Sequence, residues 1–120
     1  MAVWLLLFAL AALTLAACGG PSPASGDVRM GEGGADAVKV IAGDNMFEPA
    51  TLELDAGTEA TVEVRNDGEA AHNFVISEVD LSTGTIAAGQ VATATFTVPD
   101  EPISYVCTFH PGMQGTIEVG

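Results

Sequence analysis

The stretch YVCTFHPGM, residues 105–113, places three potential metal ligands close together near the end of the chain. Cys107, His110 and Met113 follow one another at steps of three residues. These residue types are scarce, because the 120 residues include only two cysteines, two histidines and four methionines. A Pro-Gly pair between the last two ligands predicts a tight turn that returns them toward the cysteine. The stretch therefore predicts a metal site held by a short loop.

His72 is the only other histidine of the chain, and it completes a recognisable set of ligands. One thiolate, two imidazoles and a weak thioether are the ligands of blue-copper electron-transfer sites. Taken singly, each residue has a simpler explanation, such as a buried core thiol or a core methionine. Taken together, His72, Cys107, His110 and Met113 indicate one copper ion per chain, cycling between Cu(I) and Cu(II).

The N-terminal residues 1–17 are apolar except for Thr14 and carry no charged side chain. This run is shorter than the roughly 20 residues that span a bilayer, and it predicts an export signal. It ends in LAAC, residues 15–18, which resembles the lipobox of bacterial lipoproteins. The resemblance implies cleavage before Cys18 and a lipid on its sulfur. The alternative is a simple cleaved signal in which Cys18 has no role.

A lipid on Cys18 would make the protein a membrane-anchored lipoprotein that faces the periplasm or the extracellular side. Residues 18–36 are rich in Gly, Pro and Ser and show no apolar periodicity, so they predict a flexible tether. Met30 lies in this tether and is not counted as a ligand. The folded domain is expected to comprise residues 37–120, which are enough for one core.

The predicted domain consists of short segments of alternating apolar and polar residues, separated by Gly and Pro turns. In 60–65, for example, Val62 and Val64 would point inward while Glu63 would face solvent. About seven or eight strands at this spacing predict an all-β antiparallel sandwich. The expected strands are residues 38–41, 51–54, 60–65, 72–76, 85–86, 91–98, 103–107 and 115–119.

The charge of the chain is strongly negative. Sixteen Asp and Glu against three Lys and Arg give a formal net charge of −13, and every charged side chain lies at or after Asp27. Nucleic acid is therefore not an expected partner, because its phosphates select for Lys and Arg. The charge fits solubility or steering toward a basic partner, and it could also reflect only the general acidity of exported proteins.

The Cys-x-x-His-x-x-Met spacing resembles the copper loop of the cupredoxins, and it is closest to the short loop of amicyanin-like proteins. Plastocyanins place the methionine farther on. The similarity extends to residues 44–52 and 56–58, which resemble the opening strands of the family, and to residues 72–74, which resemble its first ligand segment. The resemblance implies a Greek-key sandwich with the metal at one end.

Carried onto this sequence, the resemblance implies that His72, Cys107 and His110 are the strong ligands and Met113 the axial one. Asn73 would donate its backbone N–H to the Cys107 sulfur, and its side chain would contact the Thr108 region. Outer hydrogen bonds of this kind hold ligand geometry.

His110 would be the ligand nearest to solvent and the point of electron exchange. Around it, apolar Phe109, Pro111, Ala70 and Ala71 are expected to dock redox donors and acceptors transiently. Phe109 and the glycine at 112 stand where amicyanins often carry Pro and Phe, so the resemblance covers the ligands but not the surface around His110 or the choice of partner. Met46 is expected to pack near the site without binding the metal.

The sequence therefore predicts a monomeric one-electron carrier outside the cytoplasm. The alternative is an extracytoplasmic copper carrier or storage protein without redox turnover, although such proteins tend to use several methionines or histidines. An enzyme is not expected. A binuclear centre needs a second cysteine in the loop, and a catalytic copper needs further histidines, which the chain does not have.

Overall fold

The computed structural model describes residues 26–120, so the predicted signal, Cys18 and the start of the tether lie outside the described residues. Within the described part, the only helix is the three-residue η1 (Ser77–Val79), and no helix is long and apolar enough to cross a membrane. The strands are β1 (Asp27–Met30), β2 (Val38–Gly43), β3 (Met46–Glu48), β4 (Thr51–Leu54), β5 (Glu59–Asn66), β6 (Val75–Ile76), β7 (Leu81–Ser82), β8 (Val91–Thr97), β9 (Ile103–Val106) and β10 (Gln114–Val119).

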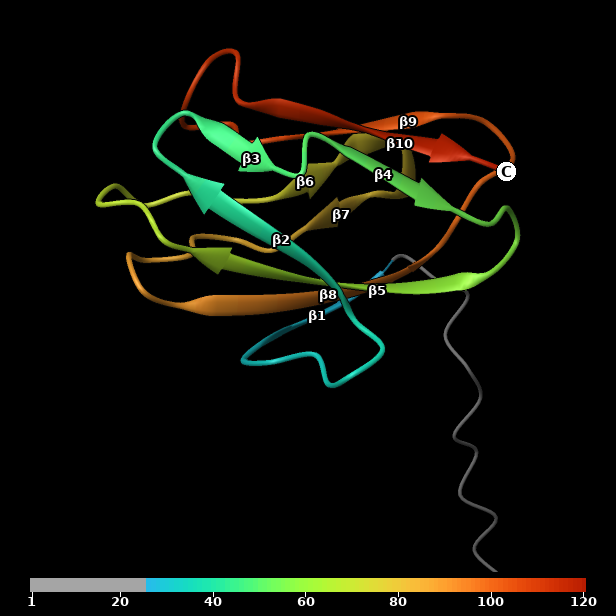
Figure 1. Cartoon of the computed structure of the whole chain (residues 1–120), viewed down its shortest axis with the longest axis horizontal. Coiled ribbons are helices and arrows are strands. Elements are labelled where there is room, and N and C mark those ends of the chain that lie inside the picture. Colours follow the sequence, from blue (N-terminus) through green and yellow to red (C-terminus); the bar gives the residue numbers. More distant parts are fainter. Residues whose placement is uncertain (1–25) are drawn as a thin grey trace, which may run out of the picture.

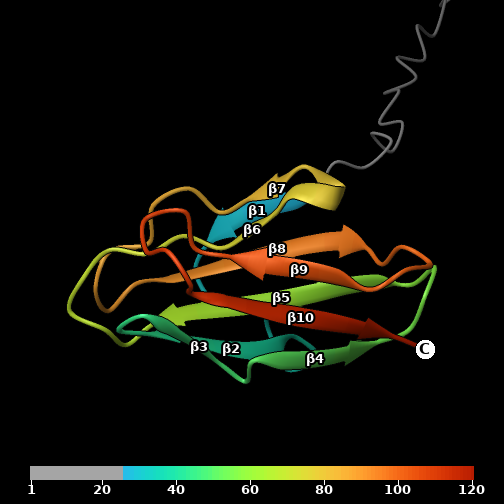
Figure 2. The same cartoon turned by 90° about the horizontal axis from the view of Figure 1, so that it is seen from above.

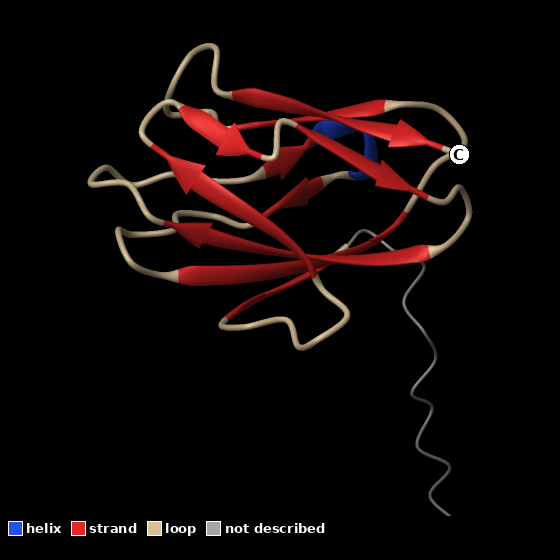
Figure 3. Ribbon diagram, in the orientation of Figure 1, coloured by secondary structure: helices blue, strands red, loops and turns tan. Residues whose placement is uncertain are grey.

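The strands form two five-stranded sheets that face each other (Figure 1). The orders are β1-β8-β5-β2-β3 and β4-β10-β9-β6-β7, and the chain crosses repeatedly from one sheet to the other (Figure 2). The predicted all-β sandwich is confirmed (Figure 3). Residues 26–120 form ten strands, where seven or eight were expected. Most neighbouring strands are antiparallel, as expected, but β2 pairs with β5 and β4 with β10 in parallel. Alternation predicts the buried face of a strand but not the direction of its neighbour.

The core lies between the two sheets, where the alternating residues were expected to point. Val62 and Val64 of β5 are fully buried, as are Ala92 and Ala94 of β8. Phe47, Phe74 and Tyr105 add an aromatic cluster with ring centroids 5.0–5.7 Å apart. Aromatic pairs at this spacing contribute about 0.5–1.5 kcal/mol beyond the area that they bury.

Tyr105 is positioned by its neighbours on the adjacent strand. A Cβ on Gly115 would overlap the Tyr105 ring, so only glycine fits at this point of β10. The Tyr105 hydroxyl donates to the Pro49 carbonyl at 2.7 Å, and burial raises the pKa of Tyr105 to about 12. A ring held in this way fixes the course of β9 just before Cys107.

The presence of β1 shortens the segment that was predicted to be a flexible tether, residues 18–36. Asp27 to Met30 pair with Thr95 to Ala92 of β8, and the Thr93 hydroxyl donates to the Gly31 carbonyl at 2.6 Å. Residues 27–36 therefore belong to the folded domain, which begins about ten residues earlier than expected. The segment lacks apolar periodicity because it lies at a sheet edge and is held mainly by backbone hydrogen bonds.

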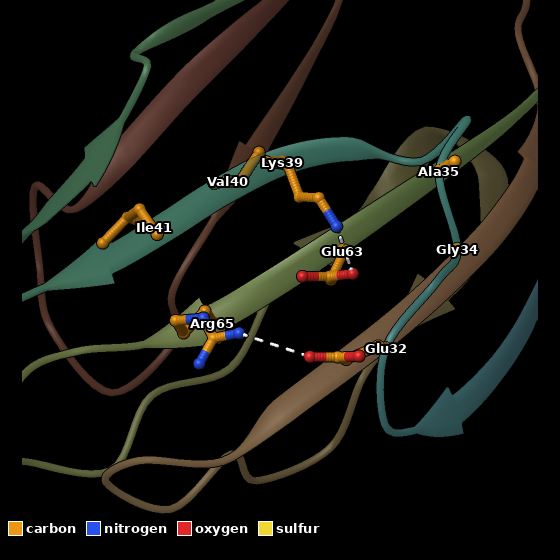
Figure 4. A pocket seen from close by; sticks show the side chains of 8 residues that line it. All are labelled: Glu32, Gly34, Ala35, Lys39, Val40, Ile41, Glu63 and Arg65. Carbon is orange, nitrogen blue, oxygen red and sulfur yellow. Dashed lines mark hydrogen bonds and ion pairs between the residues drawn. The ribbon is translucent and has the colours of Figure 1, made fainter.

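Glu63 corrects a second expectation, because it is only 3% exposed although it was predicted to face solvent. The segment after β1 covers it, as Figure 4 shows, and its carboxylate accepts hydrogen bonds from Lys39 Nζ at 2.7 Å and the Gly33 N–H at 2.9 Å. These hydrogen bonds hold the pKa of Glu63 below its ordinary value. The bond from Lys39 is the largest cause and the bond from Gly33 the next, while burial acts in the opposite direction. Beside it, Arg65 and Glu32 form an ion pair at 3.7 Å.

We expect Glu63→Gln to lower the free energy of unfolding of the metal-free protein by about 1–2 kcal/mol at pH 7, measured by urea unfolding. Because the folded state lowers the pKa of Glu63, the carboxylate stabilises the fold above the ordinary pKa of 4.5. The difference between the variant and the wild type should disappear as the pH falls through the lowered pKa. Glu118→Gln, on an exposed position of β10, is the control. Equal losses in both variants would contradict the prediction.

Candidate metal centre

Three potential ligand atoms meet at one end of the sandwich. The Nδ1 atoms of His72 and His110 lie 3.2 Å apart, and the Cys107 Sγ lies 3.8 Å from the first and 3.6 Å from the second. His72 precedes β6, Cys107 directly follows β9, and His110 lies in the loop between β9 and β10. The segment before β6 and the loop between β9 and β10 lie at the left of Figure 1, at the end opposite to the C-terminus.

These distances fit a single bound ion. Nitrogen and sulfur ligands with bonds of about 2.0–2.3 Å to one metal lie about 3.3–3.8 Å from each other. The three measured separations fall at or close to this range, and within residues 26–120 this is the only group of three such side chains close enough to hold a metal. The donor set of one thiolate and two imidazoles suits copper.

The loop brings Met113 back to the same place. The Cys107 N–H donates to the Met113 carbonyl at 2.9 Å, and the Met113 N–H donates to the His110 carbonyl at 3.1 Å. Gly112 has a φ of +85°, in the region that favours glycine, so the expected turn is present. Met113 is 1% exposed, so its side chain lies in the interior, and the two backbone hydrogen bonds hold the residue beside Cys107 and His110.

His72 is fully buried, and it does not begin a strand as expected. It exchanges two backbone hydrogen bonds with Ile86, at 3.1 and 2.7 Å, in an isolated bridge, and β6 begins only at Val75. Burial lowers the pKa of His72, the nearby His110 lowers it further, and Asp44 opposes the shift. The lowered pKa favours the neutral imidazole, which is the form that binds a metal.

Asn73 connects the two segments that carry the site. Its backbone N–H points to the Cys107 Sγ at 3.5 Å. Its side chain donates to the Thr108 hydroxyl at 2.7 Å and accepts from the Thr108 N–H at 2.8 Å. The hydrogen bonds that the resemblance implied are thus present, and they hold the beginning of the β9–β10 loop against the segment of His72.

The rim of the site is partly apolar and partly acidic. The apolar part consists of Phe109, which is 48% exposed, and of Pro111, Ala70 and Ala71, which are exposed as well. Met46, which was expected to pack near the site without binding the metal, is 54% exposed on β3. A three-residue edge strand offers no second layer to cover its side chain.

Sequence reasoning missed the acidic neighbours of His110. A pocket of about 270 Å³ beside it is lined by Asp44, Asn45, Glu69 and Ala70. Asp44 also accepts a hydrogen bond from the Glu69 N–H at 3.0 Å. The only available signal was that both acidic residues lie between expected strands, and nothing in the sequence indicates that these two connections meet.

Comparison with known proteins identifies the family. A family model described as the cupredoxin-like domain matches residues 1–119. The chain belongs to the cupredoxin family. No curated protein sequence matches it. Copper is the cofactor of cupredoxins, and His72, Cys107, His110 and Met113 are arranged as a type 1 copper site.

Solved cupredoxin structures show the same fold. A reduced amicyanin that carries a single substitution aligns with a TM-score of 0.66 at 23% identity, covering 81% of this chain and 100% of that one. The reduced auracyanin of the photosynthetic bacterium Roseiflexus castenholzii aligns with a TM-score of 0.62 at 22% identity, covering 73% and 99%. Auracyanin B aligns with a TM-score of 0.63 at 23% identity, covering 75% and 92%. At these identities the likeness concerns the fold alone.

Proposed function

We propose that this cupredoxin is a one-electron carrier that shuttles electrons between redox proteins outside the cytoplasm. The observation that carries the proposal is the convergence of the Cys107 sulfur and two imidazole nitrogens within 4.8 Å of one another, with Met113 buried beside them. When bound, copper supplies the one-electron chemistry. Both histidines of the chain belong to this site, so none remains for a catalytic copper, and we propose no enzymatic activity.

The protein contributes a rigid and dry environment. His72 and Met113 are buried, which excludes water from that side of the site. The Asn73 N–H points to the Cys107 sulfur and helps to hold it in position. Backbone hydrogen bonds within the loop keep His110 and Met113 in place without the metal. A site whose ligands are held in this way changes little between oxidation states, which favours fast electron exchange.

We expect the copper-loaded protein to absorb intensely at about 600 nm and to show narrow copper hyperfine splitting in its EPR spectrum. Its voltammetry should be reversible. Cys107→Ser should lose the absorption, because the band arises from the bond between copper and thiolate, while circular dichroism remains that of a β protein. A colourless wild type would contradict the proposed site. A blue protein without reversible voltammetry would favour the copper carrier or storage function.

We propose further that redox partners dock transiently around His110. The apolar surface is formed by Phe109, Pro111, Ala70 and Ala71, all exposed. Asp44 and Glu69 line the adjacent pocket, and no Lys or Arg does so. A small apolar contact favours fast release, and an acidic edge favours a basic partner.

We expect the rate at which hexaammineruthenium(II), a small cation, reduces the copper(II) protein to fall as ionic strength rises, measured by stopped flow. Ferrocyanide, an anion, should show the opposite trend. Glu69→Gln should weaken the salt dependence with the cation more than Glu118→Gln does, because only Glu69 lies beside His110. Equal effects of the two variants would indicate that only the net charge matters.

We propose that Cys18 carries a lipid that anchors the exported protein to a membrane. The support is the lipobox-like LAAC at residues 15–18 after an apolar run. Because β1 begins at Asp27, only residues 19–26 connect Cys18 to the domain, and a fully extended chain of this length spans at most about 28 Å. The domain is then held close to the membrane surface.

We expect the full chain, expressed in a lipoprotein-processing bacterium, to separate into the detergent phase of Triton X-114. Cys18→Ser should move it to the aqueous phase, because the lipid has no attachment point. Cys107→Ser, which changes the other cysteine, should leave the partition unchanged. Recovery of the wild type in the aqueous phase would contradict the lipid anchor and favour a simple cleaved signal.

A further inference from the structure

The second nitrogen of His72 has no partner. Its Nδ1 faces Cys107 and His110, whereas its Nε2 is buried and makes no hydrogen bond to any described residue. A neutral imidazole that binds a metal through Nδ1 carries its proton on Nε2. A buried N–H without an acceptor costs about 1–3 kcal/mol, so an acceptor is expected nearby. Histidine ligands of metals usually donate this proton to a carboxylate or carbonyl.

Gly68 shows which group lies next to this nitrogen. A Cβ on Gly68 would lie 3.1 Å from His72 Nε2 and 2.5 Å from Asp44 Oδ1. The imidazole nitrogen and the carboxylate oxygen therefore border the same small space. The φ of Gly68 is not in the left-handed region, so any residue could adopt its backbone conformation, and the requirement for glycine is steric.

Backbone groups outside the space between Asp44 and His72 hold Asp44 in place. It directly follows β2, and its Oδ1 accepts the Glu69 N–H at 3.0 Å. The Asp67 N–H also donates to the Ala42 carbonyl at 3.0 Å, which fixes the β2 end against the segment before His72.

We propose that Asp44 is a positioning residue for His72, that its carboxylate receives the Nε2–H of the metal-bound imidazole, and that Gly68 keeps the space between them open. This inference rests on the proposed copper site and goes beyond it, because it names the residue that fixes the tautomer and ring orientation of one ligand. A negative charge at this place also favours Cu(II) over Cu(I), so Asp44 lowers the reduction potential.

The test compares Asp44→Asn with Asp100→Asn in the copper-loaded protein. Both substitutions remove one negative charge, but Asp100 is exposed in the loop before β9, at the opposite end of the sandwich. Asp44→Asn retains an oxygen for the Glu69 N–H, so folding should be little changed. We expect it to raise the reduction potential above those of the wild type and Asp100→Asn, and to weaken Cu(II) binding by about 10-fold or more.

Two further measurements distinguish the positioning of the His72 ring from the general effect of removing one negative charge. In Cu(I)-loaded protein, ¹H–¹⁵N NMR should show a protected His72 Nε2–H in the wild type, shifted and faster to exchange in Asp44→Asn but not in Asp100→Asn. Gly68→Ala should also raise the potential, because its Cβ displaces the carboxylate.

Equal potentials for Asp44→Asn and Asp100→Asn, with an unchanged Nε2–H resonance, would overturn the inference. A wild type without the blue band would instead overturn the carrier function. The NMR comparison distinguishes the two failures, because a copper storage protein would also hold Cu(I).

Discussion

The hydrogen bonds of Asn73 are the constraint on which the metal site depends. They join the segment of His72 to the loop of Cys107, which lies 35 residues farther along the chain. A thiolate and an imidazole brought together from such distant positions would separate without a rigid connection, because ordering flexible segments costs conformational entropy. The amide of Asn73 bonds to both the hydroxyl and the N–H of Thr108, so it fixes position and orientation together.

The two ends of the sandwich differ in construction. At the metal end, loops carry the ligands and an acidic pocket borders His110. At the other end the N-terminal segment enters the fold, because Asp27 pairs with Thr95 of β8 and β1 then runs toward the metal end. The site is thus presented away from the point where the preceding chain joins the domain (Figure 1). The buried carboxylate of Glu63 holds the covering segment in place through Gly33.

Periodicity predicted the strands that border the core and missed the others. β5, β8 and β9 have one apolar face each, and their inward residues are buried as expected. β1, β3 and β7 have two to four residues, too few for alternation to be visible, and they lie at sheet edges. The ligands could be predicted because their chemistry is scarce in this chain, whereas acidic residues are too numerous for Asp44 to stand out.

By itself, the sequence determined the chemistry of the site and the class of fold, because a Cys-x-x-His-x-x-Met loop with one remaining histidine admits a single set of ligands. The tertiary structure alone decided which nitrogen of His72 faces the sulfur and which face of β5 is covered. It also decided that the turn after β2 meets the segment before His72. These features depend on contacts between segments distant in sequence, and local patterns of residues carry no information on such distances.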